Sequence, residues 1–277
     1  GGDVFRKKNV VSLETSNKRI NHAITADAEI FYGQNFISNI HPKQTFKLIK
    51  DSLLRPAFIN RINNLENTVS VFVINAILKP NTIPYTDQNY YYFDSYDVWS
   101  GPIYETSQWP TAYAFYQTPN EMNQKYVRSI SIMAYMRFEE VAPWASSFKT
   151  TLEENNRGES YENFKTQKAE KLIACFRKNF PAVADSIVEY YTSSPLTYRD
   201  YIWNDDGSLY GIQKNADELY KTYISPLTKI ENLFLTGQNI NLHGILGVTI
   251  GAVLTCTAIL GNKDLIRKIQ QANAIKN

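Results

Sequence analysis

The sequence predicts a mixed α/β (α+β) fold with a mostly antiparallel sheet, accompanying helices and a separate strand–loop–helix unit. Two observations carry this prediction. Runs of β-branched and aromatic residues recur between residues 70 and 138, as in the strands of an antiparallel sheet. Near the C-terminus, Asn232 to Gly261 joins a short apolar run to a glycine-marked turn and a long apolar segment.

Composition narrows the classes of protein that fit. The 277 residues include 43% hydrophobic and 20% charged residues, which is enough to form a core and argues against global disorder. The net charge is +2, from 29 basic and 27 acidic residues, so composition does not indicate nucleic-acid binding. Cys175 and Cys256 lie far apart, and neither a disulfide framework nor a metal site is expected. The polar N-terminus lacks a signal-peptide pattern, so we expect a cytoplasmic protein, with peripheral membrane contact as a further expectation.

The stretch from Asn232 to Gly261 carries no formal charge apart from what His243 could hold. Leu233 to Leu235 has the composition of a buried strand, Thr236 to Asn239 supplies turn residues, and a helix can run from Ile245. Three interpretations compete for it: a transmembrane helix with a G-x-x-x-G pattern, a buried core helix, or a turn that binds phosphate at a helix N-terminus.

This stretch resembles the C-terminal flavin-binding segment of the phytoene desaturase, carotenoid isomerase and retinol saturase group of FAD-dependent oxidoreductases. The resemblance rests on Leu235-Thr236-Gly237 at the strand end and on Gly244 to Gly251 in the loop and helix start. Gln238 departs from the acidic residue that many relatives carry, although an amide can still bond a ribityl hydroxyl. The cofactor contacts that the resemblance implies are Val10, Thr236, Gly237, Gln238, Asn239, His243, Gly244, Leu246, Gly247 and Val248.

The N-terminal residues resemble the middle of the same flavoproteins. Gly1-Gly2-Asp3-Val4 precedes a predicted hairpin with a turn at residues 16–19 and a return strand at residues 20–25. In the family, the valine that corresponds to Val10 touches the adenine through its backbone. Ser38-Asn39 resembles the end of that segment, and Pro42 is placed to open a helix.

The G-x-G-x-x-G pattern that opens members of the family does not occur in this sequence. We therefore expect a C-terminal fragment with partial FAD-binding segments at residues 1–48 and 229–277 and a substrate-binding domain at residues 49–228. We expect the full-length protein to bind FAD, and the fragment to bind FAD weakly or not at all. The missing N-terminal half of the same chain is then the expected partner of these segments.

The central region is the candidate substrate domain. Strands are predicted at residues 70–78, 90–93, 111–116 and 127–138, where many of the 19 tyrosines gather. Two interpretations stay open for these aromatic residues. They could line a tunnel for a long apolar substrate, or they could be ordinary strand aromatics that pack against helices.

An amphipathic helix is predicted from Gly158 to Phe180, where Pro181 follows. Beyond it, residues 192–201 and 207–211 resemble a Thr-Pro-Leu-Thr-type turn and a Gly-x-x-Tyr-Gly loop that line the flavin and substrate cavity in the family. The implied cavity residues are Pro195, Thr197, Arg199 and Tyr210. Arg199 could bind a phosphate or an anionic flavin, or it could form a structural salt bridge with Asp200 or Asp205.

No Ser-His-Asp order, acid pair or metal-ligand cluster is evident, and His243 could bond either a flavin or the backbone. This pattern suits chemistry that a cofactor carries. The resemblance implies an oxidoreductase that transfers hydride between FAD and a carbon–carbon double bond of an apolar, isoprenoid, retinoid or carotenoid-like substrate. The alternatives are a non-catalytic lipid or prenyl-group carrier on the same fold and an amine oxidase-like flavoenzyme.

Overall fold

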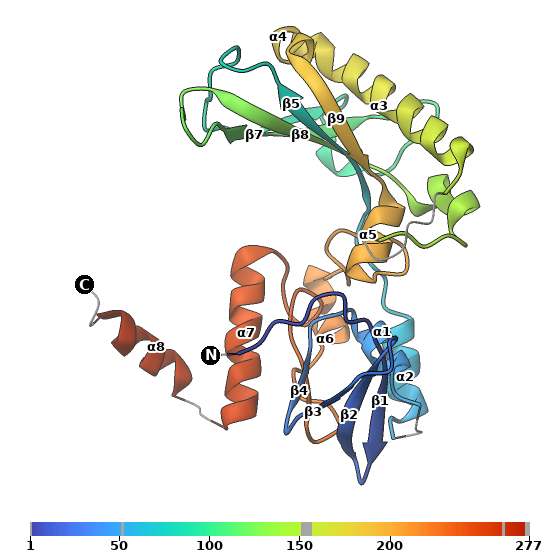
Figure 1. Ribbon diagram of the computed structural model, residues 1–277, viewed down its shortest axis with the longest axis vertical. Coiled ribbons are helices and arrows are strands. Elements are labelled where there is room, and N and C mark those ends of the chain that lie inside the picture. Colours follow the sequence, from blue (N-terminus) through green and yellow to red (C-terminus); the bar gives the residue numbers. More distant parts are fainter. Residues whose placement is uncertain (1, 51–52, 151–156, 262–263, 275–277) are drawn as a thin grey trace. The chain divides into compact units, whose positions relative to one another are not determined.

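The computed structural model describes residues 2–50, 53–150, 157–261 and 264–274, and the chain divides into two compact units (Figure 1). Unit 1 combines residues 1–68 with residues 210–277, and unit 2 is the continuous stretch from Val69 to Leu209. The chain passes between the units at 68/69 and 209/210, because Ile62, Ile212 and Ile224 belong to the core of unit 1. The domain roles expected for residues 1–48, 49–228 and 229–277 stay predictions.

Unit 2 is built on a five-stranded antiparallel sheet in the order β6-β7-β8-β5-β9. Its strands are β5 (Val71–Leu78), β6 (Tyr90–Phe93), β7 (Ala112–Pro119), β8 (Val127–Tyr135) and β9 (Ile187–Ser193). Four of them coincide with the apolar and aromatic runs in the sequence, so the predicted antiparallel sheet is confirmed. The edge strand β9 was not anticipated, because Glu189 and its exposed neighbours break the apolar run.

Helices cover one face of this sheet. The predicted amphipathic helix is present as α3 (Glu159–Asn179), and α4 (Pro181–Asp185) begins directly after it at Pro181. Figure 1 shows both helices lying over the sheet. The shorter elements of unit 2 are the 3-10 helices η1 (Val98–Ser100) and η2 (Phe138–Trp144) and the helix α5 (Pro195–Ile202).

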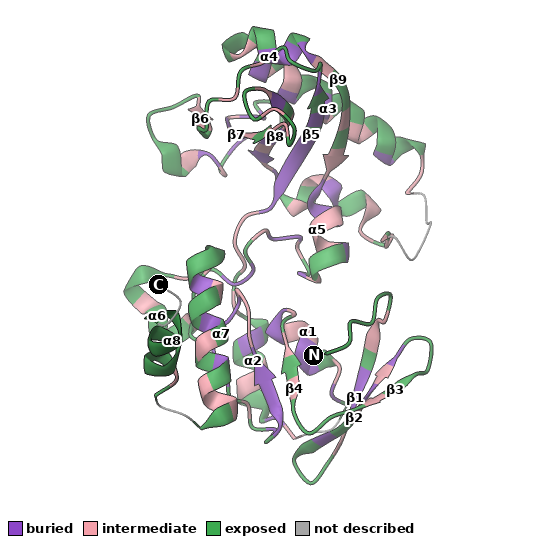
Figure 2. Ribbon diagram, turned by 60° about the vertical axis from the view of Figure 1, so that its left-hand side comes forward, coloured by how far each residue is buried: buried purple, intermediate pink, exposed green. Residues whose placement is uncertain are grey.

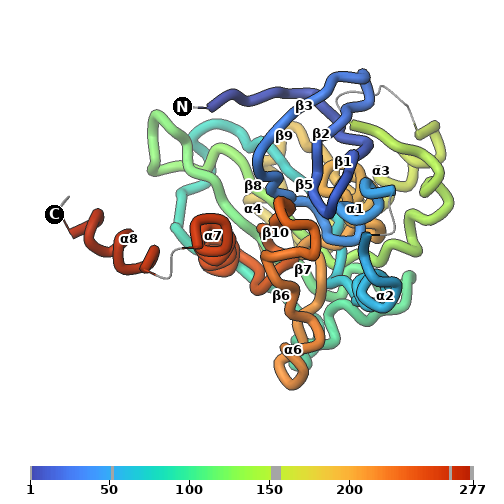
Figure 3. The backbone as a smooth tube through the Cα atoms, turned by 90° about the horizontal axis from the view of Figure 1, so that it is seen from below, coloured from blue at the N-terminus to red at the C-terminus, as the bar shows by residue number. Residues whose placement is uncertain are grey.

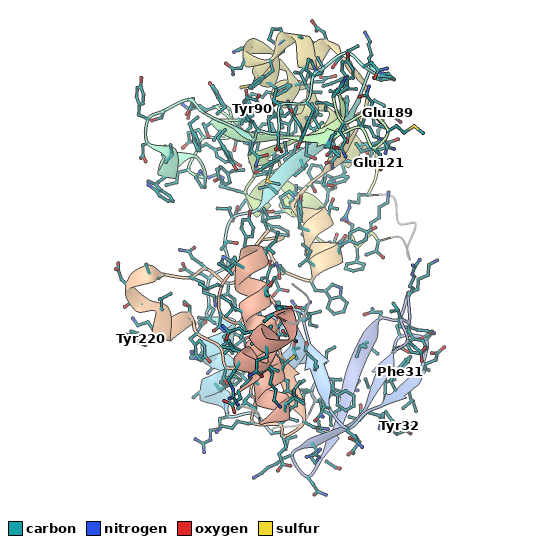
Figure 4. The ribbon with its side chains drawn as sticks, turned by 90° about the vertical axis from the view of Figure 1, so that its left-hand side faces the viewer. Phe31, Tyr32, Tyr90, Glu121, Glu189 and Tyr220 are labelled. Atoms are coloured by element: carbon teal, nitrogen blue, oxygen red, sulfur yellow. The ribbon has the colours of Figure 1, made fainter. Side chains whose placement is uncertain are left out.

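Aromatic rings fill the layer between the sheet and α3. Tyr90 stacks on Phe115 with ring centroids 5.3 Å apart, and Phe176 of α3 stacks on Phe180 at 5.1 Å. Tyr113 is buried against Phe176 in the same core. Figure 4 shows Tyr90 among the crowded side chains of this layer. For these rings the structure has ordinary packing of strand aromatics on a helix rather than a tunnel.

Unit 1 contains the predicted hairpin as part of a three-stranded antiparallel meander. Its strands are β1 (Val10–Ser16), β2 (Arg19–Thr25) and β3 (Ile30–Tyr32), which lie side by side in Figure 3. Asn17 and Lys18 form the turn with φ values of 49° and 61°, and two successive positive φ angles suit the twist of a two-residue hairpin.

A second, parallel sheet in unit 1 joins β4 (Phe36–Ser38) to β10 (Leu233–Leu235). The remaining helices of unit 1 are α1 (Pro42–Lys47), α2 (Pro56–Asn63), η3 (Ala216–Glu218), α6 (Leu219–Thr222), α7 (Gly244–Leu260) and α8 (Leu265–Ala274). Pro42 opens α1 as predicted. The mixed α/β class is therefore confirmed, with the strand–turn–helix unit of the C-terminal region inside unit 1.

Candidate cofactor site

The candidate site lies where the two parallel strands of unit 1 end. β4 and β10 run in the same direction, with Ser38 paired to Leu235, so Asn39 and Thr236 leave the sheet at the same edge. The Thr236 amide donates to the Ser38 carbonyl over 2.9 Å and extends the pairing by one residue. In open α/β sheets, ligands bind outside this carboxyl edge.

Gly237 makes the turn after β10, and its environment admits no side chain. Its φ is +90°, in the region that glycine favours, and a Cβ atom built on it would lie 1.9 Å from Asn39 Oδ1. The turn residue predicted from the Leu-Thr-Gly pattern therefore has a structural reason to be glycine. The Asn39 side chain, which follows β4, lies against this turn.

Helix α7 packs on β10 through a stripe of small residues at every fourth position. Gly247, Gly251 and Thr255 are the buried residues of the helix. The Gly237 carbonyl oxygen lies 3.8 Å from a Cβ built at Gly251, and a Cβ at Gly247 would come within 2.6 Å of the Leu242 backbone. The glycines thus allow the helix to approach the strand and the loop before it.

The first turn of α7 presents its backbone to solvent. His243 occupies the N-cap with an extended backbone, and its side chain does not cap the helix. Gly244, Ile245 and Leu246 are all exposed. The free N–H groups of a helix N-terminus and its positive dipole end attract an anion. This turn is therefore a candidate site for an anionic group.

The His243 side chain turns back into unit 1. Its Nε2 atom lies 2.8 Å from the Ile212 carbonyl, so this nitrogen is the donor, and its ring stacks on Tyr210 with centroids 5.8 Å apart. Of the two alternatives for His243, the structure shows the hydrogen bond to the backbone. Tyr210, which was expected to line the same cavity, is brought next to it.

Asn239 and Lys214 fix the loop before α7. The buried Asn239 side chain accepts from the Ile212 amide over 3.1 Å, close to Gly211. Lys214 Nζ donates to the carbonyls of Thr222, Asn239 and Ile240 over 2.9, 3.1 and 3.4 Å. Burial, with a smaller contribution from Arg61, lowers the pKa of Lys214 to about 8. This role of Lys214 could not be predicted, because an isolated lysine in a loop has no recognisable sequence pattern.

The other implied cofactor residues have different surroundings. Gln238 and Val248 are half-buried, whereas Leu246 is 73% exposed. Val10 opens β1 and pairs with Thr25, so it belongs to the meander rather than to the β4–β10 sheet. The structure brings the residues from Thr236 to Val248 together in one strand–turn–helix unit, and the role of Val10 stays a prediction.

The remaining cavity candidates lie in unit 2, on α5. The segment expected to form a turn instead begins this helix, because Ser194 caps it and exchanges hydrogen bonds with Thr197 while Pro195 fits the first position. Arg199 donates to Asp200 over 2.7 Å and to the Ala145 carbonyl over 2.6 Å. Of the two alternatives for Arg199, the structure has the salt bridge with Asp200.

The apolar surface of α7 distinguishes it from a core helix. Outside the buried stripe, five large apolar side chains are exposed: Ile245, Leu246, Ile250, Leu254 and Leu260. Figure 2 shows exposed and half-buried positions over most of the helix. Among the described residues no single helix is long and apolar enough to cross a membrane; α7 and α8 meet that composition only as a bent pair. A helix that is apolar all round normally has neighbours on every side.

The face of the unit 2 sheet that points away from α3 is divided into an apolar and a polar half. Tyr91, Ala114, Met133 and Val73 pair across four strands, and we call them the apolar row. The next row carries Tyr116, Ser131, Asn75 and Tyr191, with a hydrogen bond of 2.7 Å between Ser131 and Asn75. Val73 is buried in this row, so Tyr91, Ala114 and Met133 are its accessible members.

Comparisons with known proteins agree with this architecture. No protein-family model matches the chain. Human all-trans-retinol 13,14-reductase is 34% identical over 140 residues, which are 48% of this chain and 22% of that protein. The Danio rerio all-trans-retinol 13,14-reductase is 26% identical over 170 residues, or 60% of this chain and 25% of that protein. The matched residues span about a quarter of the length of these relatives.

Two solved structures of redesigned putrescine oxidase share the fold. A triple mutant gives a TM-score of 0.52 at 14% identity and covers 97% of this chain and 50% of its own. A double mutant also gives 0.52, at 12% identity, with 94% and 48% covered. The chain therefore has the fold of this class of oxidoreductases. Its sequence relatives are all-trans-retinol 13,14-reductases, which confirms the resemblance to the retinol saturase type.

Proposed function

We propose that this chain forms the substrate domain and the C-terminal flavin-binding part of an FAD-dependent oxidoreductase. Its substrate would be an apolar, isoprenoid or retinoid-like molecule with a carbon–carbon double bond. The observation that carries the proposal is the exposed first turn of α7, which follows the Gly237 turn at the carboxyl edge of β4 and β10. The names of the sequence relatives support the reductase class and the retinoid-like substrate.

In this proposal each part of the chain has a limited task. Backbone amides of Gly244, Ile245 and Leu246 hold the diphosphate, while the Gly237 turn keeps that helix start at the sheet edge. The bound flavin would supply hydride transfer. The apolar row of unit 2 orients the substrate and excludes water. An N-terminal half of the same protein with a G-x-G-x-x-G turn would hold the rest of the dinucleotide and cover the apolar side of α7.

Substitution of Ile245 tests the cofactor site without disturbing the core. Ile245 is 88% exposed, and an acidic residue in the first turn favours a helix, so Ile245→Glu should fold normally. In the longer protein, the new carboxylate should repel the diphosphate and lower FAD affinity about a hundredfold, about 2.7 kcal/mol. Ile245→Gln is the matched control and should retain flavin. Equal flavin content in both variants would contradict a diphosphate site at the first turn of α7.

The same preparations separate the rival functions. Stoichiometric flavin that bleaches with a reductant and reoxidises with a retinoid or related polyene supports the proposed enzyme. Anaerobic bleaching by an amine would support an amine oxidase, and lipid carried without flavin would support a carrier. The 277-residue chain alone should bind FAD weakly or not at all. A yellow, stoichiometric complex of this chain would contradict the need for a second half.

A further inference from the structure

We propose that α8 is a docking element for a membrane surface that carries anionic lipid. The starting observation is that none of its described side chains is buried, although the helix is strongly one-sided. Leu265, Ile266, Ile269 and Ala272 share one side of the helix by their spacing. Ile266 is 60% exposed and Ile269 is 40% exposed, so this apolar side has solvent in front of it.

The charge of the residues around α8 indicates an anionic partner. The residues from 262 to the C-terminus carry Lys263, Arg267, Lys268 and Lys276 against one acidic residue, Asp264. This local excess stands out in a chain whose 29 basic and 27 acidic residues nearly balance. By spacing, Arg267 lies opposite Ile269, where it forms an exposed ion pair of 3.2 Å with Asp264, and Lys268 flanks the apolar side. A short helix with aliphatic residues on one side and basic residues around them suits the boundary between acyl chains and anionic headgroups.

The proposal concerns α8 alone and does not depend on the proposed function. The apolar side of α7 has no charged residue near it from Gly244 to Gly261, so attraction to anionic headgroups has no source there. In α8, exposed apolar side chains and basic side chains occur together within ten residues. Surface binding therefore should need both the isoleucines and the cations, and should weaken as salt screens the cations.

Co-sedimentation of the 277-residue chain with lipid vesicles tests the proposal. We expect binding to phosphatidylcholine vesicles with 30% phosphatidylserine, and at least tenfold weaker binding to phosphatidylcholine alone. Ile266→Gln with Ile269→Gln should weaken binding to the anionic vesicles more than tenfold. Arg267→Gln with Lys268→Gln should reduce the salt dependence by roughly half, because Lys263 and Lys276 remain. Both changes lie on exposed positions of a helix that tolerates glutamine.

Ile103→Gln with Val188→Gln is the matched control, because it removes two exposed aliphatic side chains from unit 2. It should leave vesicle binding unchanged. No binding of the folded chain to either vesicle would overturn the proposal, and so would equal loss in the control pair. Self-association that only the isoleucine pair abolishes, without vesicle binding, would assign α8 to contact with a second copy instead.

Discussion

The Thr255 hydroxyl on α7 lies 2.9 Å from the Leu235 carbonyl on β10. It lies equally close to the Gly251 carbonyl, one turn earlier in its own helix. Thr255 thereby links the helix to the strand at the one side of α7 that is buried. This hydrogen bond is one of the contacts that hold α7 against β10.

Replacing Thr255 by valine keeps the shape and removes the hydroxyl. We expect a loss of about 1–2 kcal/mol in the free energy of unfolding, because the Leu235 carbonyl loses a buried donor. Thr257→Val is the matched control, since its hydroxyl donates to the Val253 carbonyl of the same helix and to no other described residue. It should cost less than about 0.5 kcal/mol. Urea unfolding of both variants measures the difference, and equal costs would remove the special role of Thr255.

Gly237 and Gly158 offer a second matched pair, with φ values of +90° and +89°. Alanine is strained at both positions, because side chains rarely adopt a φ near +90°. At Gly237 the methyl group also collides with Asn39, whereas no atom of the described residues lies within 4 Å at Gly158. Gly237→Ala should therefore lower the free energy of unfolding by at least about 1 kcal/mol more than Gly158→Ala. A smaller difference would mean that Asn39 can move aside.

Asp200 is a buried anion in unit 2, with Arg157 and Arg199 as ion-pair partners. Its carboxylate also accepts from the Lys149 amide over 2.8 Å. Asp200→Asn leaves two guanidinium groups without their buried anion and should cost about 3–5 kcal/mol. Asp185→Asn, which loosens the exposed pair with Arg177, should cost less than about 1 kcal/mol. Thermal unfolding distinguishes the two, and similar melting temperatures would contradict the prediction.

Lys214 predicts a pH dependence. Its pKa is about 8 in the folded protein and 10.5 when unfolded, so between these values the unfolded state binds more protons. The free energy of unfolding should therefore rise with pH across this window. We expect about 1–2 kcal/mol, less than the full shift would give, because three carbonyls stabilise the ammonium.

In Lys214→Met, the free energy of unfolding should not show this rise between pH 7.5 and pH 10. The exposed control Lys221→Met should still show it. The same slope in both variants would show that other groups titrate in this window.

The apolar row predicts a change in substrate binding that depends on the proposed function. Met133→Gln places an amide in the middle of the row and should raise KM for a retinoid-like substrate about tenfold, as expected for burial of one polar group. Flavin content should not change. Thr118→Gln on the exposed, polar half of the same face is the control. Unchanged KM in Met133→Gln would move the substrate away from this face.

Local sequence patterns predicted much of the fold. Alternating and β-branched runs identified four strands of unit 2, and the stripe of Tyr161, Leu172 and Phe176 identified α3. The glycines after β10 indicated the turn and the helix start, because only glycine fits where Gly237 and Gly247 meet the backbone or Asn39. These features depend on residues close together in the chain.

Features that depend on distant residues could not be predicted in the same way. The clamp of Lys214 on Asn239 and Ile240, and the pairing of Arg199 with Asp200 and Arg157, arise only when separate segments meet. The exposed side of α7 was also unexpected, because an uncharged helix suggests burial on all sides. The division of the cavity candidates, with Tyr210 in unit 1 and Arg199 in unit 2, follows from the actual change of unit at 209/210.

The split of unit 1 into two distant segments affects how the protein can be made. Asn232 bonds the Ile20 amide from 212 positions away, and β4 finds its only described strand partner in β10. During synthesis, the continuous unit 2 can fold while residues 1–68 still wait for that partner to leave the ribosome. The early segments then lack these packing partners until residues 232–235 have been translated.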